Sequence, residues 1–215
     1  MAGPKPQASQ RRRRPDGEAS RVRILDAATE IASERGYEGT SIALVSTKSG
    51  LPASSIYWHF KDKDDLLAAV IERSFAHWLS AWEMPTEGPD RERLVAMALQ
   101  IAKALSDSPD FLRLGLMLAL ERRPIEPRAR AMFVDVRAQT QNTLSGAIRA
   151  LAPGLTCAQV QQLVTYAVAG ADGLFVAKEI GGDSIDLPAL FEMHAITLYD
   201  TARRMLAEQN TSSAD

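Results

Sequence analysis

Apolar residues recur at helical spacing through most of this chain, and glycine or proline interrupts the pattern at short intervals. The first such segment ends at Gly36 and places five apolar residues on one face: Ile24, Leu25, Ala28, Ile31 and Ala32. Spacing of three and four residues predicts an amphipathic helix. The sequence shows no convincing strand alternation and no internal repeat, so the predicted fold class is all-α.

The breaks divide the chain into successive helices. We expect these over about residues 20–35, 41–48, 52–59, 63–82, 90–106, 109–122, 127–151, 156–180 and 187–208. Thr40 is the expected N-cap of the second helix, and Thr156 with Gln159 has the spacing of a capping box. This order predicts an N-terminal three-helix domain at 20–65, joined by a linker helix to a larger helical bundle at 66–208. A disordered basic arm at 1–19 and a disordered tail at 209–215 complete the expected organisation.

Composition excludes several classes of protein. Of 215 residues, 46% are hydrophobic and one is cysteine, Cys157, which excludes a disulfide framework and a cysteine-rich zinc module. No apolar run reaches the length of about 18 residues that spans a bilayer. Glycine-rich phosphate loops and hydrolase motifs are absent, and the three histidines are too scattered for a metal site. We therefore expect a cytoplasmic protein that is not an enzyme and has no metal or cofactor.

Charge is distributed unevenly along the chain. Residues 1–24 hold seven positive and two negative side chains, and the rest of the chain carries a net charge of −7. Arg11, Arg12, Arg13 and Arg14 are contiguous. A basic arm on an acidic body is typical of a protein that binds a polyanion. The alternative is a solvated tail without a partner.

Residues 40–63 read TSIALVSTKSGLPASSIYWHFKDK, which predicts two short helices around a turn at Gly50. This is the pattern of a helix-turn-helix. Ile56 and Phe60 would face inward. The rest of the second short helix would then be exposed and could enter a DNA major groove. That exposed set comprises Ala53, Ser54, Ser55, Tyr57, Trp58 and His59.

The stretch SGLPASSIYWHFKDKDDLL resembles the DNA-binding signature of the TetR family of transcriptional regulators, and ILDAATEIASERGYEGTSI before it is similar to that family's first helix. The specific resemblance covers about residues 20–70. It implies a ligand-responsive, homodimeric DNA-binding regulator, most often a repressor. Beyond residue 80 the resemblance is helix count and the Ala171–Leu174 stretch.

The resemblance also implies roles for individual residues. It implies DNA contacts from Thr40, Lys48, Ser54, Ser55, Tyr57, His59 and Lys63. Trp58 is large for a groove surface, so we expect it to contact DNA near the backbone. Independently of the resemblance, the charge of the arginine arm, Arg11 to Arg14, predicts that it contacts DNA as well. Pro52 and Ala53 depart from the polar or basic residues usual in the family. With few strong base readers left, recognition would lean on thymine methyl contacts and DNA shape.

The second half would hold the dimer interface and the effector pocket. Two glycines inside one helix, Gly170 and Gly173, indicate close approach of another helix, with Leu174 beside them. The alternative is that these glycines pack inside the monomer. The expected lining of a largely apolar effector pocket is Trp82, Phe111, Leu114, Met117, Phe133, Arg137, Tyr166 and Asp172.

Two other functions remain open at this point. A small helical enzyme would show turnover without binding DNA. A helical protein-interaction adaptor would show no salt-dependent DNA affinity.

Overall fold

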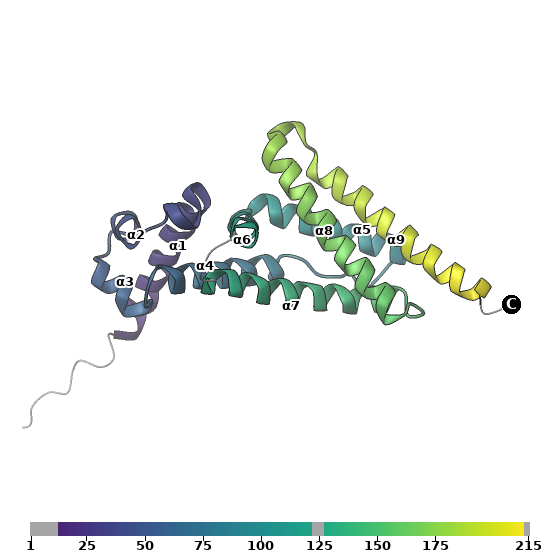
Figure 1. Cartoon of the computed structure of the whole chain (residues 1–215), viewed down its shortest axis with the longest axis horizontal. Helices are drawn as coiled ribbons and strands as arrows, with labels where there is room; N and C mark the ends of the chain where they lie inside the picture. The colour runs from purple at the N-terminus through teal and green to yellow at the C-terminus, as the bar shows by residue number, and fades with distance from the viewer. Residues whose placement is uncertain (1–12, 122–126, 213–215) are drawn as a thin grey trace, which may run out of the picture. The chain divides into compact units, whose positions relative to one another are not determined.

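The computed structural model describes residues 13–121 and 127–212, and every regular element within these ranges is a helix (Figure 1). The all-α prediction is confirmed. The elements are α1 (Arg13–Gly39), α2 (Ile42–Ser49), α3 (Ala53–His59), α4 (Lys63–Ser80), α5 (Asp90–Asp107), α6 (Asp110–Leu120), α7 (Arg128–Leu151), α8 (Cys157–Gly181), η1 (Gly182–Ser184) and α9 (Leu187–Ser212).

The two ends of the helical region differ from expectation. Helix α1 begins at Arg13 rather than near Ser20, so residues 13–19 are helical. Gly36 has a φ of 66°, which bends the chain where the sequence predicted an end. Helix α9 continues to Ser212, past the expected start of the tail. Residues 1–12 and 213–215 lie outside the described residues.

The chain divides into two compact units whose boundary differs from the expected one. The first unit runs to Arg73 and includes Asp110–Phe133, and the second comprises Ser74–Pro109 and the chain from Val134 onward. Helix α6 therefore belongs with the N-terminal helices. The physical reason is that α6 packs directly on α1.

The first unit is built on α1, against which α2, α3 and α6 pack. The side chains of this unit that are completely removed from solvent include, among others, Ile24, Leu25, Val45, Ile56, Leu66 and Leu67. Helices of seven or eight residues are too short to be stable alone in water. The conformation of α2 and α3 therefore depends on this shared core.

One carboxylate joins three helices of the first unit. Asp64, in the first turn of α4, accepts hydrogen bonds from the backbone N–H groups of Arg128 at 2.6 Å and Ala129 at 3.1 Å. It also accepts one from the Tyr37 hydroxyl of α1 at 3.2 Å. The first N–H groups of a helix have no partner within that helix. Asp64 thus caps α7 from another helix.

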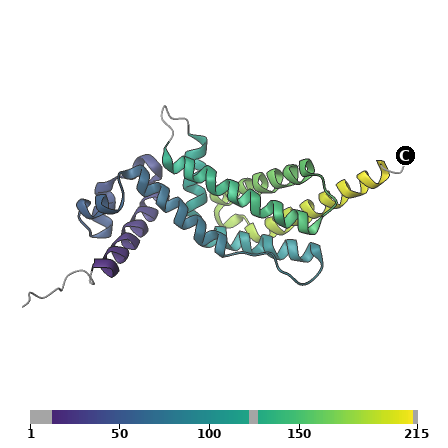
Figure 2. The same cartoon turned by 90° about the horizontal axis from the view of Figure 1, so that it is seen from below.

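In the second unit, α9 lies beside both α8 and α5 (Figure 2). The predicted capping box at the start of α8 is confirmed. Thr156 accepts a hydrogen bond from the Gln159 backbone N–H at 3.3 Å, and Gln159 accepts one from the Thr156 backbone N–H at 2.9 Å. Within the described ranges, no helix combines the length and the apolar character that crossing a membrane requires.

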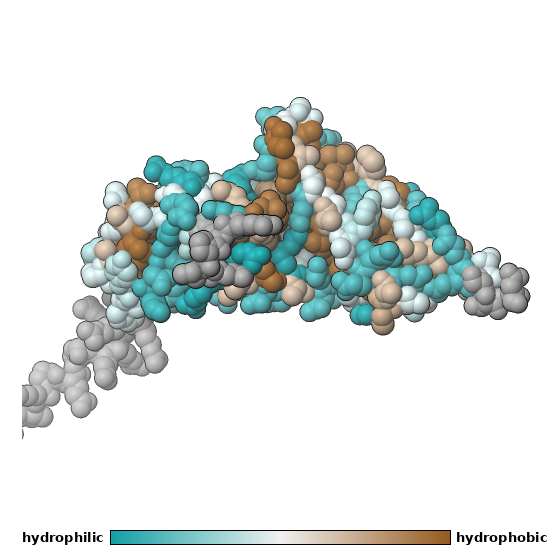
Figure 3. Space-filling view, viewed as in Figure 1, coloured by the Kyte–Doolittle hydropathy of each residue, from teal (hydrophilic) through white to brown (hydrophobic). Residues whose placement is uncertain are grey.

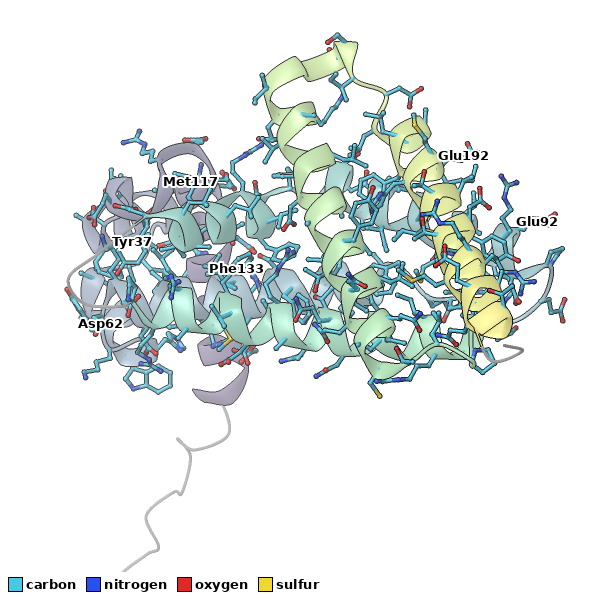
Figure 4. All side chains as sticks on the ribbon, turned by 45° about the vertical axis from the view of Figure 1, so that its right-hand side comes forward. Tyr37, Asp62, Glu92, Met117, Phe133 and Glu192 are labelled. Carbon is cyan, nitrogen blue, oxygen red and sulfur yellow. The ribbon has the colours of Figure 1, made fainter. Side chains whose placement is uncertain are left out.

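Two helical glycines differ in what surrounds them. A Cβ on Gly115 of α6 would stand 2.1 Å from the Phe133 ring, which lies on the side of α7 toward α6 (Figure 4). Around Gly146 of α7, no described atom lies within 4 Å of the equivalent position. Glycine is therefore required for close packing at the first position only.

We predict opposite effects for the same substitution at these two sites. Gly115→Ala should lower the free energy of unfolding by about 1–3 kcal/mol, because the buried Phe133 ring must move. Gly146→Ala should raise it by up to about 1 kcal/mol, because alanine favours an exposed helix. Urea denaturation followed by circular dichroism measures both. Equal effects of the two substitutions would contradict the observed packing of α6 on Phe133.

Candidate nucleic-acid interface

The turn between α2 and α3 is held by backbone conformation and by α1. Gly50 adopts a left-handed conformation with φ 65°, which ends α2 as the sequence predicted. The Arg23 guanidinium of α1 donates a hydrogen bond to the Ser49 carbonyl at 2.6 Å. Ile56 and Phe60 are buried, as expected. Helix α3 is thereby fixed by its inner face, and its outer face stays open.

The outer face of α3 carries the side chains that the sequence predicted there. Ser54 is exposed, Tyr57 is 57% exposed and Trp58 is 75% exposed. Ser55 and His59 are half-buried at the edges of this face. A hydroxyl, a phenol and a large aromatic ring thus point outward from two turns of one helix. Such a surface can donate hydrogen bonds to phosphate oxygens and contact base edges.

The charge state of His59 is set by α1. Partial burial lowers the pKa of His59, the nearby Arg21 guanidinium lowers it further, and Glu18 opposes them. His59 is therefore mainly neutral at pH 7 in the absence of a ligand. A phosphate placed beside the ring would favour the protonated form.

Both lysines expected to contact DNA are engaged within the first unit. The Lys48 ammonium pairs with Glu30, and this hydrogen bond raises the pKa of Lys48. The Lys63 ammonium donates to the Tyr37 carbonyl at 3.1 Å, lies 4.3 Å from the Tyr37 ring centroid and is 3.5 Å from the Glu38 carboxylate. Lys63 thus stabilises the junction between α1 and α4.

The expectation for Thr40 is wrong in its geometry. Thr40 is 1% exposed, and its hydroxyl donates to the Gly36 carbonyl at 2.8 Å. Ser41 is the N-cap of α2, accepting a hydrogen bond from the Leu44 backbone N–H at 3.2 Å. The kink at Gly36 draws Thr40 inward, and the adjacent hydroxyl takes the capping position.

Sequence reasoning did not single out two exposed or half-exposed polar residues near α3. Ser41 stands at the start of α2, and Lys61 follows α3 with its backbone N–H bonded to Asp65 at 3.0 Å. Its position in the sequence, directly after the inward-facing Phe60, could have indicated that Lys61 lies at the exposed end of α3. Of the arginine run, Arg11 and Arg12 lie outside the described residues. The backbone of Arg13 and Arg14 forms the first turn of α1.

Comparison with known proteins agrees with this geometry. Residues 24–70 match the family profile described as "Bacterial regulatory proteins, tetR family". The match shows similarity to this family over the helix-turn-helix segment. The match begins inside α1 and ends inside α4, so it contains the whole of α2 and α3.

Curated relatives match about half of this chain. A transcriptional repressor of Mycobacterium tuberculosis is 32% identical over 109 residues, which are 51% of this chain and 42% of the relative. The fatty acid metabolism regulator protein of Bacillus subtilis is 25% identical over 127 residues, 58% of this chain and 64% of the relative. The chain thus spans about half the length of the curated relatives it matches.

Solved structures share the overall fold. A transcriptional regulator from Rhodococcus sp. has a TM-score of 0.69 at 20% identity and covers 86% of this chain and 96% of its own. The regulator FadR from Bacillus subtilis in complex with stearoyl-CoA has a TM-score of 0.67 at 20% identity. The similarity covers 83% of this chain and 97% of FadR. At this identity the similarity shows the fold alone.

The residues expected to line an effector pocket are divided between the two units. Phe111, Leu114 and Phe133 are buried in the first unit, and Trp82 is buried in the second. Two of them lie at the surface. Met117 is 47% exposed with its methyl group against Gly36, and Tyr166 is 52% exposed.

The two expected polar anchors are paired with each other. Arg137 of α7 donates to one carboxylate oxygen of Asp172 on α8, and both side chains are about one-fifth exposed. The other oxygen, Oδ1, is buried and has no hydrogen-bond partner among the described residues. Burial raises the pKa of Asp172, and Arg137 lowers it in part.

The two glycines of α8 have different surroundings. A Cβ on Gly170 would stand 2.2 Å from the His194 ring of α9, and that ring bonds the Ala167 carbonyl at 3.0 Å. Gly170 therefore serves packing inside the unit, which was the alternative interpretation. At Gly173, no described atom lies within 4 Å of the Cβ position, and Leu174 is half-buried.

Proposed function

We propose that this chain is a DNA-binding transcriptional regulator, a homodimeric repressor that a small, largely apolar effector releases from its operator. The observation that supports it best is the outer face of α3, where Ser54, Tyr57 and Trp58 are exposed on a helix held by its buried inner face. The match of residues 24–70 to the tetR family supports the same function. Its single cysteine, Cys157, suits a reducing cytoplasm.

In this proposal α3 enters the major groove. Tyr57 and His59 donate hydrogen bonds to phosphates at the groove edge, Ser54 and Ser55 face base edges, and Ser41 lies at the start of α2 near the backbone. Lys48 gives up its ion pair with Glu30, which is an exposed partner, and pairs with a phosphate instead. With serine and alanine as the readers, much of the specificity comes from DNA shape.

The dimer surface we propose lies on α8 and α9. Exposed apolar side chains follow one another along α8 at helical spacing, with Gly173 among them: Tyr166, Val176 and Ile180. Met193 of α9 is also exposed. Figure 3 shows apolar surface over the end of α8 that leads into η1. A second copy of the same surface would bury these side chains, and two-fold symmetry would present two α3 helices to successive turns of DNA.

The effector we propose interacts with the Arg137–Asp172 pair. A ligand donor can satisfy Asp172 Oδ1, or an anionic ligand group can take the guanidinium from the carboxylate. Stearoyl-CoA, the ligand of the Bacillus subtilis regulator, is a reasonable first compound to test because it combines a long apolar chain with anionic groups.

The route from effector to DNA-binding face would use α7. This helix carries Arg137, and its first turn is capped by Asp64 of α4. Asp64 also binds Tyr37 of α1. A small shift of α7 would therefore pull on both α4 and α1. An effector that favours the shifted state would lower affinity for DNA.

We predict that the double variant Tyr57→Phe, His59→Ala binds DNA weakly and stays folded. Each lost hydrogen bond to a phosphate costs about 1.5 kcal/mol, roughly a tenfold rise in Kd. The measurement is fluorescence anisotropy with a duplex selected from a random-sequence library. His77→Ala, an exposed histidine on α4, is the control and should bind normally. Wild-type affinity in the folded double variant would refute the proposed function.

We predict that Gly173→Leu weakens the dimer without unfolding the monomer. The monomer has room for the side chain, whereas overpacking a helix interface costs about 1–3 kcal/mol. Gly146→Leu, at an equally open helical position on α7, is the matched control. Sedimentation velocity over a concentration series should show dissociation of the first variant only. An unchanged dimer in Gly173→Leu would place the interface elsewhere.

A further inference from the structure

Trp58 leaves a large apolar ring uncovered on the outer face of α3. The side chain is 75% exposed, whereas an aromatic side chain in a core or an interface buries on the order of 150–250 Å². Tyr57, the other exposed aromatic residue of this helix, ends in a hydroxyl that can bond a phosphate. The indole ring of Trp58 has a single N–H donor, and the rest of its surface is stabilised only by an apolar partner.

Trp58 stands at the centre of this outer face. Successive residues of a helix are about 100° apart around its axis, so Trp58 lies about 160° from the buried Ile56. Tyr57 and His59, the residues proposed to bond phosphates, flank Trp58 at about 100° on either side. A helix that places these two residues at the edges of a groove directs Trp58 toward the base edges between them.

The residues proposed to face base edges belong to the same surface. Ser54 and Ser55 precede Trp58 by one turn of α3, and residues at that spacing are neighbours on a helix. The size of Trp58 alone favours a place near the DNA backbone. Its position on α3 instead groups it with the two serines.

The ring of Trp58 is held in place without being covered. A Cβ on Gly17 of α1 would stand 3.7 Å from the ring atoms Cη2 and Cζ3, which is ordinary van der Waals contact. The His59 ring packs edge-on against the indole, with centroids 4.6 Å apart and planes at 87°. A side chain that is ordered before binding loses less rotamer freedom on binding. The ring is therefore prepared for a contact with a partner outside the chain.

Thymine is the base that offers an apolar group in the major groove. The edges of guanine, cytosine and adenine present hydrogen-bond donors and acceptors there, whereas thymine adds its C5-methyl group. We propose that Trp58 is a specificity-determining residue that selects thymine by packing its ring against this methyl group. The inference rests on the proposed function, since it requires that α3 enters the major groove.

A cycle that removes the ring and the methyl group separately tests this contact. The proteins are the wild-type chain and Trp58→Ala, in which folding is checked by circular dichroism. The duplexes are the selected sequence and copies in which deoxyuridine replaces one thymine at a time, in one half-site or in both. Deoxyuridine lacks only the methyl group and keeps the base pair. The measurement is Kd by fluorescence anisotropy at fixed salt.

At the contacted position we expect the wild-type Kd to rise about fourfold for one methyl group lost and about 15-fold when both half-sites are changed. Trp58→Ala should bind the original duplex more weakly and respond to the same replacement by less than about twofold, because the ring and the methyl group are coupled. Trp58→Phe keeps an aromatic face and should keep most of the wild-type response. Tyr57→Phe is the matched control: it should bind more weakly but keep the full response to deoxyuridine.

Four results would overturn the proposal while leaving DNA binding intact. They are a selected duplex without thymine in its half-sites, a wild-type Kd that deoxyuridine changes at no position, wild-type affinity in Trp58→Ala, and an equal methyl response in Trp58→Ala and wild type. The last result would assign the methyl group to another side chain and place the ring at the DNA backbone. Absence of sequence-selective binding by the wild-type chain would overturn the proposed function, and this inference with it.

Discussion

Burial of the inner face of α3 is the interaction on which the rest of the first unit depends. Ile56 is completely buried and Phe60 is 3% exposed, and α3 packs against α1 and α2. A seven-residue helix has too few internal hydrogen bonds to persist by itself. Because the core fixes one side of α3, the opposite side can remain polar and aromatic without loss of structure. A rigid exposed helix face is what binding in a DNA groove requires.

The same unit connects this face to the rest of the chain through specific polar contacts. Lys63 joins α4 to the end of α1, and Asp64 joins α4, α1 and α7. A surface salt bridge contributes little stability. A carboxylate at the start of a helix contributes more, because it accepts hydrogen bonds from backbone N–H groups that have no partner within that helix. These contacts give Lys63 and Asp64 a role inside the protein. Their role is to set the relative positions of helices around α3.

Local sequence patterns predicted what depends on local physics. The interruption of helical geometry at Gly36, the left-handed turn at Gly50, the buried Ile56 and the Thr156–Gln159 box follow from backbone freedom, helical spacing and capping. Long-range choices were not predictable. Whether Thr40 or Ser41 caps α2, whether Lys48 meets Glu30, and whether Gly170 faces His194 depend on which helices become neighbours. Roles for the α3 face, the dimer surface and the effector residues remain proposals.

The most direct test of the central claim is to map the DNA-binding surface of the intact protein by NMR. Backbone amide shifts of isotope-labelled protein would be followed during titration with the selected duplex, and with a shuffled duplex as control. Our account predicts that the largest shift changes occur near Ser41 and in residues 54–61, which lie in α3 and directly after it. These changes should be smaller with the shuffled duplex. Shift changes confined to α8 and α9, or no changes at all, would contradict it.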